Sequence, residues 1–249
     1  YPRDDGWVGF AADGKQVIAH SIKLPAIISD EALGVALYEP FTELIAAAGQ
    51  VRIIATGALL TRDLHGLPFE GSPLFTHLPV AYALDLARPQ FAPPRPITHG
   101  LLVAANPGGE VPRLRFVARE TEDVAEQWAQ LGLVTTRLVG VNATRSAVLR
   151  QDTRVDILHF IGHHLQRPEA AHSSNPWDHE LTLEGGTSLA VEDVLVATAT
   201  SMPRVVFLSA CQTGLIDPEV ASGGVALGHS FLLRGAELVI ATARPVDDA

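Results

Sequence analysis

Cysteine is nearly absent from this sequence: Cys211 is the only one among 249 residues. An internal disulfide framework is therefore excluded, and the lone thiol favours a reducing compartment, so we expect a cytoplasmic protein. Long apolar runs are also missing, since no stretch reaches the ~18 residues that a membrane-spanning helix needs. The chain starts at Tyr1 without the charged and apolar segments of a secretion signal, and we expect it to be an excised or processed piece.

Aromatic and charged side chains are scarce as well. Aromatic residues make up 6% of the chain and charged residues 18%, with a formal net charge of −10. The 18 Lys and Arg residues are scattered and form no basic stripe interleaved with aromatic residues, which argues against nucleic acid as a partner. Hydrophobic residues, mostly aliphatic, reach 47%, a composition that suits helices packed on a sheet of Val, Ile and Leu.

The first part of the chain mixes short elements. Apolar residues recur at helical spacing over residues 31–48, and Pro40 inside that run predicts a break near Glu39. A short strand is predicted over residues 51–55, and the turn residues of 56–74 predict a hairpin and tight loops. Four prolines in residues 87–99 then indicate a linker.

Beyond the linker, predicted strands and helices alternate. The strands cover residues 100–105, 133–139, 155–161, 205–209 and 237–242, and the helices cover 117–131, 144–150, a stretch from 191, and 222–234. Thr144 is the expected N-cap of the second helix, and a polar loop is expected over residues 165–179. Such alternation predicts a parallel sheet with helices on both faces. We therefore expect an α/β protein with a three-layer α/β/α core over residues 96–249 and an N-terminal extension, residues 1–95, packed on it.

Two predicted strands end in reactive side chains. Residues 159–164 read His-Phe-Ile-Gly-His-His, and residues 209–214 read Ser-Ala-Cys-Gln-Thr-Gly. In an open parallel sheet, function gathers beyond the carboxyl ends of the strands. A thiol must lose its proton to attack an amide, and a neighbouring imidazole takes that proton and later returns it to the leaving amine. His163 and Cys211, 48 residues apart, are the candidates for this pair.

These two segments resemble the CHAT domain, the bacterial branch of the caspase-like peptidases related to separase. The likeness extends to Leu67-Pro68-Phe69-Glu70, to Asn142-Ala143-Thr144 and to residues 223–242. The His lies about 50 residues upstream of the Cys in caspases, as it does here. The resemblance implies a caspase-like fold over residues 1–249 and a peptidase that needs no metal or cofactor.

The same resemblance implies roles for individual residues. Cys211 would be the nucleophile, His163 the general base and acid, and the backbone amides of Cys211 and His164 the oxyanion hole. The family usually has Gly at the position of His164, and it usually continues past residue 242 with an aromatic segment that this sequence lacks. We therefore expect the substrate pocket to include residues beyond this chain. Within it, the acidic candidates for a pocket that takes a basic side chain are Asp156, Glu219, Asp247 and Asp248.

Expected partners are a protein substrate and, by resemblance, a regulatory repeat or sensor region in cis or in trans. A rival interpretation is a catalytically inactive caspase-like interaction or scaffold module. A metal hydrolase is a third, because several potential ligands cluster in sequence: His159, His163, His164, His172, Asp178 and His179. Residues four apart on a strand are about 13 Å apart, too far for one zinc ion, and this disfavours His159 and His163 as joint ligands.

Overall fold

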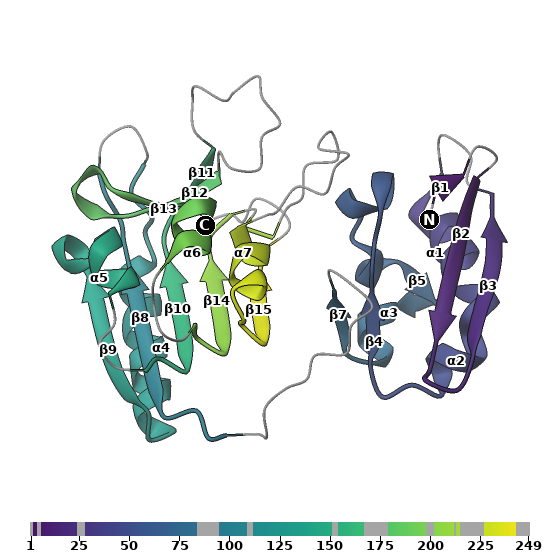
Figure 1. Ribbon diagram of the computed structural model, residues 1–249, viewed down its shortest axis with the longest axis horizontal. Helices are drawn as coiled ribbons and strands as arrows, with labels where there is room; N and C mark the ends of the chain where they lie inside the picture. Colours follow the sequence, from purple (N-terminus) through teal and green to yellow (C-terminus); the bar gives the residue numbers. More distant parts are fainter. Residues whose placement is uncertain are drawn as a thin grey trace. The chain divides into compact units, whose positions relative to one another are not determined.

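The computed structural model describes residues 2–3, 6–23, 28–83, 95–108, 112–150, 154–166, 179–197, 202–211, 213–214 and 227–242. The chain divides into two compact units, Tyr1–Arg88 and Pro89–Ala249 (Figure 1). The division falls inside the proline-rich stretch at residues 87–99. Each unit has a hydrophobic core of its own.

The first unit opens with a three-stranded antiparallel sheet made of β1 (Pro2–Arg3), β2 (Gly6–Ala12) and β3 (Val17–Ile22). Helix α1 (Asp30–Tyr38) follows, with the Ser29 hydroxyl accepting from the Ala32 amide as its N-cap. A 3-10 turn (Glu39–Phe41) that contains Pro40 separates α1 from α2 (Thr42–Ala46), so the predicted break near Glu39 is confirmed. The sheet β1–β3 precedes the first element that the sequence pattern predicts.

The rest of this unit consists of short elements. Strand β4 (Val51–Ile53) pairs in parallel with β7 (Val80–Tyr82), and the predicted hairpin is formed by β5 (Pro68–Phe69) and β6 (Ser72–Pro73). Helix α3 (Leu74–His77) follows it. The core of the unit includes Leu33 from α1 and Leu74 from α3, both almost fully buried.

The second unit is built on a five-stranded sheet in the order β15-β14-β10-β8-β9, with every neighbouring pair parallel. These strands are β8 (His99–Ala104), β9 (Val134–Val139), β10 (Ile157–Ile161), β14 (Val205–Ser209) and β15 (Leu238–Ala241). All five lie within two residues of the predicted bounds. The expected mixed α/β class with a parallel central sheet is confirmed.

Helices cover both faces of this sheet. Helix α4 (Val117–Gln130) packs on one face, where Trp128 contacts a cluster that includes Leu102 and Ile161. Helices α6 (Val191–Val196) and α7 (Leu227–Leu233) pack on the other face, against the alternate residues Leu158, Phe160 and Val206. This arrangement is compatible with three layers. The short helix α5 (Arg145–Leu149) begins after Thr144, whose side chain accepts from the Ala147 amide as the predicted N-cap.

The connection after β10 differs from the sequence expectation. A polar loop was expected over residues 165–179, but residues at both of its ends pair as strands. Strands β11 (His164–Gln166), β12 (His179–Thr182) and β13 (Ser188–Ala190) form a small antiparallel sheet. Its fully buried Leu181 and Leu189 join the core on the α6 and α7 side, which explains why polar neighbours do not keep this segment in a loop.

Strand order also marks where a site is expected. The chain passes from β8 through α4 to the edge strand β9, and then returns to β10 on the other side of β8. The connections that leave β8 and β10 therefore run over opposite faces of the sheet. Such a switch in direction opens a crevice beyond the carboxyl ends of the two strands.

Candidate functional site

The register of β10 and β14 places two of the predicted residues level with each other. Ile161 pairs with Ser209 at the carboxyl ends of these neighbouring parallel strands. His163 lies two residues after Ile161, and Cys211 lies two residues after Ser209. The interval of 48 residues between the paired strand ends is therefore also the interval between His163 and Cys211. The two side chains therefore leave the sheet at the same edge, from adjacent strands.

Gly162 shapes the approach to His163. A Cβ atom there would lie 2.7 Å from the Ala105 carbonyl oxygen and 2.9 Å from the Phe160 ring. The Gly162 amide also donates to the Ser209 carbonyl at 3.2 Å, and the Ala105 amide donates to the Ile161 carbonyl at 3.0 Å. The chain thus passes tightly between the ends of β8 and β14, and a side chain at this position would push His163 out of place.

The imidazole of His163 is held by a backbone carbonyl. Its Nε2 atom lies 2.8 Å from the carbonyl oxygen of Pro112, in the connection that follows β8. A carbonyl only accepts, so Nε2 carries the proton and donates, and in the neutral ring Nδ1 holds the lone pair. That connection is itself tied down, since the Asn106 side chain bonds the backbone of Leu114 at 2.8 and 2.9 Å. Pro112 was not predicted, because a backbone carbonyl leaves no signature in a sequence.

Cys211 lies in a turn that is fastened to the end of β15. Thr213 is fully buried, and its hydroxyl donates to the Ala210 carbonyl at 3.3 Å and accepts from the Thr242 amide at 3.4 Å. The Gly214 amide donates to the Thr242 carbonyl at 2.9 Å. The Thr and Gly of the Ser-Ala-Cys-Gln-Thr-Gly segment therefore hold the turn, in which Cys211 is half-buried.

The backbone amide of His164 points away from β12. The Thr182 amide donates to the His163 carbonyl at 2.9 Å, which makes His164 and Leu181 a non-hydrogen-bonded pair of the antiparallel ladder. In such a pair, the N–H groups are directed outward from the ladder. The His164 N–H thus makes no hydrogen bond to β12, and this is a condition for a donor to an oxyanion.

The family model of the CHAT domain matches residues 29–249. The chain belongs to the CHAT domain family. This family is related to the caspase-like peptidases, and the resemblance seen in the sequence is confirmed. The match begins at Ser29, the N-cap of α1, so the sheet β1–β3 lies outside it. No curated protein matches the chain.

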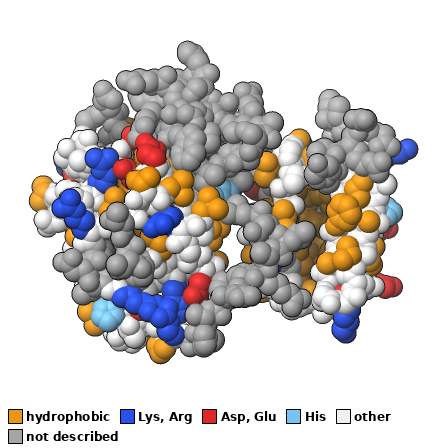
Figure 2. Space-filling model, in the orientation of Figure 1, with side chains coloured by type: hydrophobic (Ala, Val, Ile, Leu, Met, Phe, Trp, Pro, Cys, Tyr) orange, Lys and Arg blue, Asp and Glu red, His pale blue; other side chains and the backbone are white. Residues whose placement is uncertain are grey.

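Of the four acidic candidates for the pocket of this CHAT domain, Asp156 does not lie beside Cys211. Asp156 precedes β10 and so lies at the amino edge of the sheet, opposite to His163. Lys and Arg side chains gather where the strands begin (Figure 2). Arg154 pairs there with Asp156 at 3.4 Å, and Arg204 pairs with Glu237 at 2.8 Å.

Asp156 is a buried structural carboxylate. It accepts from the Thr98 amide and hydroxyl, both at 2.9 Å, and from the His99 amide at 3.2 Å. Burial alone would raise the pKa of Asp156, but these hydrogen bonds outweigh it and lower the pKa. The expectation that Asp156 lines a substrate pocket is therefore corrected. Glu219, Asp247 and Asp248 lie outside the described residues.

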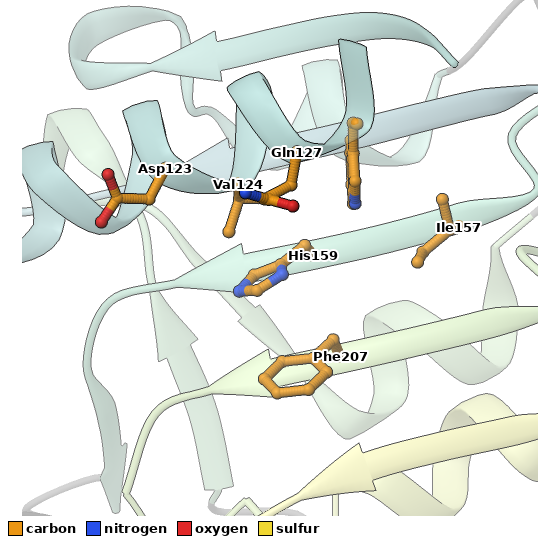
Figure 3. A pocket seen from close by; sticks show the side chains of 7 residues that line it. Asp123, Val124, Gln127, Ile157, His159 and Phe207 are labelled. Carbon is orange, nitrogen blue, oxygen red and sulfur yellow. The ribbon is translucent and has the colours of Figure 1, made fainter. Parts of the chain in front are cut away.

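His159 sits in a separate cavity of about 280 Å³ between α4 and the strands β10 and β14 (Figure 3). Its Nε2 atom lies 3.1 Å from a carboxylate oxygen of Glu120, and its ring stacks on Phe207 with centroids 4.6 Å apart. His159 is thus a packed, hydrogen-bonded imidazole. It faces α4 and is two residues before the end of β10, away from the turn that carries Cys211.

The histidines of the metal interpretation separate into different environments. Among the residues that the structure describes, no three His, Cys, Asp or Glu side chains form a group suited to a metal ion. His159 contacts Glu120, His163 contacts Pro112, and His164 contacts His179. His172 and Asp178 lie outside the described residues. No helix in the described ranges is long and apolar enough to cross a membrane.

His164 makes the stability of this CHAT domain sensitive to acid. Burial lowers the pKa of His164 from its ordinary value of 6.5 to about 4, and the neighbouring His179 adds to the effect. The unfolded chain therefore binds a proton more readily than the folded one between these two values. We expect the stabilisation to be complete above pH 6.5 and to fall by up to roughly 3 kcal/mol as the pH drops to 4.

Urea unfolding at pH 7.5, 6, 5 and 4 measures this dependence. The buried His229, whose pKa burial also lowers, contributes with the same sign. The difference between wild type and His164→Gln isolates the share of His164. Parallel stability curves for the two proteins would contradict this prediction.

Proposed function

We propose that this CHAT domain is a cysteine endopeptidase that cleaves protein substrates through a Cys211 thioester, with a caspase-like arrangement of the site. The observation that carries the proposal is the level placement of His163 and Cys211 past the paired Ile161 and Ser209. The Pro112 carbonyl supports it, because it leaves the lone pair of His163 on Nδ1.

The first half of the reaction forms the thioester. Nδ1 of His163 takes the proton of the Cys211 thiol, and the thiolate sulfur attacks the carbonyl carbon of the scissile peptide bond. The carbonyl oxygen becomes an oxyanion, which the backbone amides of Cys211 and His164 stabilise. The proton on Nδ1 then passes to the nitrogen of the leaving amine as the C–N bond breaks.

The second half releases the acyl group. Nδ1 of His163 takes a proton from a water molecule, whose oxygen attacks the thioester carbon. The C–S bond breaks, and the sulfur recovers a proton from His163. In this scheme the Pro112 carbonyl keeps Nε2 as a donor throughout and stabilises the imidazolium that forms in each half.

A regulatory region in cis or in trans is part of the proposal by family resemblance. The half-buried Cys211 is compatible with a site that a partner completes. The proposal does not require that partner to belong to the same polypeptide.

Peptide sequencing tests the function. The protein is incubated with a library of denatured cellular proteins, and new N-termini are identified by mass spectrometry, with and without prior treatment with iodoacetamide. Cleavage that iodoacetamide abolishes and a chelator leaves intact is the expected result. Cleavage that survives alkylation of Cys211 would contradict a thiol mechanism. A library left uncut, with Cys211 no more reactive than free cysteine, would favour the non-catalytic interaction module.

A further inference from the structure

We propose that His164 and His179 form a positioning pair, which holds the backbone of Cys211 in place through the His164 side chain. This inference rests on the proposed cysteine peptidase activity and names two further residues that act on the same site. Neither side chain would touch the substrate or the reacting atoms. Their role would be to fix the residue that carries the nucleophile.

The two rings meet across the small antiparallel sheet. His164 is opposite Leu181 and Gln166 is opposite His179, so His164 and His179 lie on the same face as diagonal neighbours. Their rings are parallel within 1°, with centroids 5.0 Å apart. Nδ1 of His179 lies 3.0 Å from Nε2 of His164, within hydrogen-bond distance.

The His164 ring also reaches the neighbouring strand end. It forms a hydrogen bond with the backbone of Cys211, and this contact favours the protonated form of the ring. A hydrogen bond that favours the protonated ring is one in which a ring N–H donates to a carbonyl oxygen. The His164 side chain therefore links β11, which continues from β10, to the turn that carries Cys211.

Together the contacts define which nitrogen holds each proton. A neutral imidazole has one donor and one acceptor. If the donor N–H of His164 is used on the Cys211 carbonyl, its Nε2 atom must accept the proton that Nδ1 of His179 carries. His179 thereby fixes the tautomer of His164, in the way that a second partner orients a metal-binding histidine. Burial supports this arrangement, since it keeps the His164 ring neutral near pH 7.

The pair explains why a side chain is useful at a position where the family usually has glycine. The backbone amide of His164 is directed away from β12 and serves the proposed oxyanion hole. The side chain of His164 holds the carbonyl of Cys211, and the amide of Cys211 is the second donor of the proposed oxyanion hole. One residue thus sets the spacing between the two donors.

The experiment compares wild type with His179→Ala and His179→Asn. Alanine removes the donor that fixes the tautomer, whereas the asparagine amide N–H lies close to the position of Nδ1. We expect kcat for a cleaved peptide to fall roughly tenfold in His179→Ala with KM within about twofold of wild type, and to recover in His179→Asn. The rate of alkylation of Cys211 by iodoacetamide should follow the same order.

A matched control is His99→Ala, because His99 is equally half-buried but lies at the amino edge of β8. Thermal unfolding checks that all variants are folded. Unchanged kcat and alkylation in His179→Ala, with an active wild type, would overturn the pair and leave the peptidase standing. If wild type cleaves nothing, the peptidase proposal fails. The alkylation rates of Cys211 then still test the His164–His179 pair. Equal rates in wild type and His179→Ala would overturn the pair, and a slower rate in the variant would support it.

Discussion

Replacing Cys211 by alanine is expected to lower peptide cleavage by at least about 10³-fold, because no other thiol exists in the chain to form the thioester. The change is small and the side chain is half-buried, so the fold should persist. The turn around it is held by Thr213, Gly214 and Thr242, and none of these hydrogen bonds involves the sulfur. Cleavage of a peptide identified by sequencing, measured as kcat/KM, gives the result.

Cys211→Ser is the matched variant for this prediction. Serine keeps the shape of the residue and supplies a hydroxyl, which is a far weaker nucleophile beside a base set to accept a thiol proton. Both variants should unfold at temperatures within a few degrees of wild type. Retained cleavage in Cys211→Ala would show that the reaction uses another group, and it would remove the mechanism rather than adjust it.

Replacing His163 by alanine is expected to lower kcat by about 10²- to 10⁴-fold, because the thiol and the leaving amine lose their proton acceptor and donor. KM should change less than kcat, since the ring acts on the reacting atoms rather than on substrate side chains. The alkylation rate of Cys211 should fall in parallel. Kinetics on the same peptide and the iodoacetamide reaction provide both measurements.

His159→Gln is the control on β10, the strand that leads to His163. It lies four residues from His163, faces α4, and its replacement retains a polar group for Glu120. We expect a loss of stability from the broken ring stack with Phe207, and kcat within a few-fold of wild type. A larger drop in kcat for His159→Gln than for His163→Ala would make His159 the base. It would refute the placement of His163 beside Cys211 that follows from the β10–β14 register.

Residues with strong local patterns were predicted well. Four of the five strands of the parallel sheet are dominated by apolar residues, whereas β9 reads Val-Thr-Thr-Arg-Leu-Val. Residues 155–161 and 205–209 carry enough Val, Ile, Leu and Phe to be identified as strands from the sequence alone. Thr144 was predicted as an N-cap because the hydroxyl acts on its own neighbours. Such features depend on contacts within a few residues, which a sequence displays directly.

Features that depend on distant contacts were missed or misplaced. Asp156 was assigned to a pocket because of its charge, but the strand direction puts it at the other edge, where Thr98 and His99 bind it. Pro112 was missed because it acts through a carbonyl. The pairing of β11 with β12 was missed because its apolar residues contact the core only after α6 and α7 have packed. Each outcome is decided by residues more than ten positions away.

The ladder between β10 and β14 also changes how relatives of this chain are to be compared. Each functional residue is placed by counting two steps from the end of its own strand, and the hydrogen bonds between the strands keep those ends level. Insertions between residues 166 and 179 would therefore alter the number of residues from His to Cys without moving either side chain, so strand ends, and not the interval between the two residues, are the quantity to align.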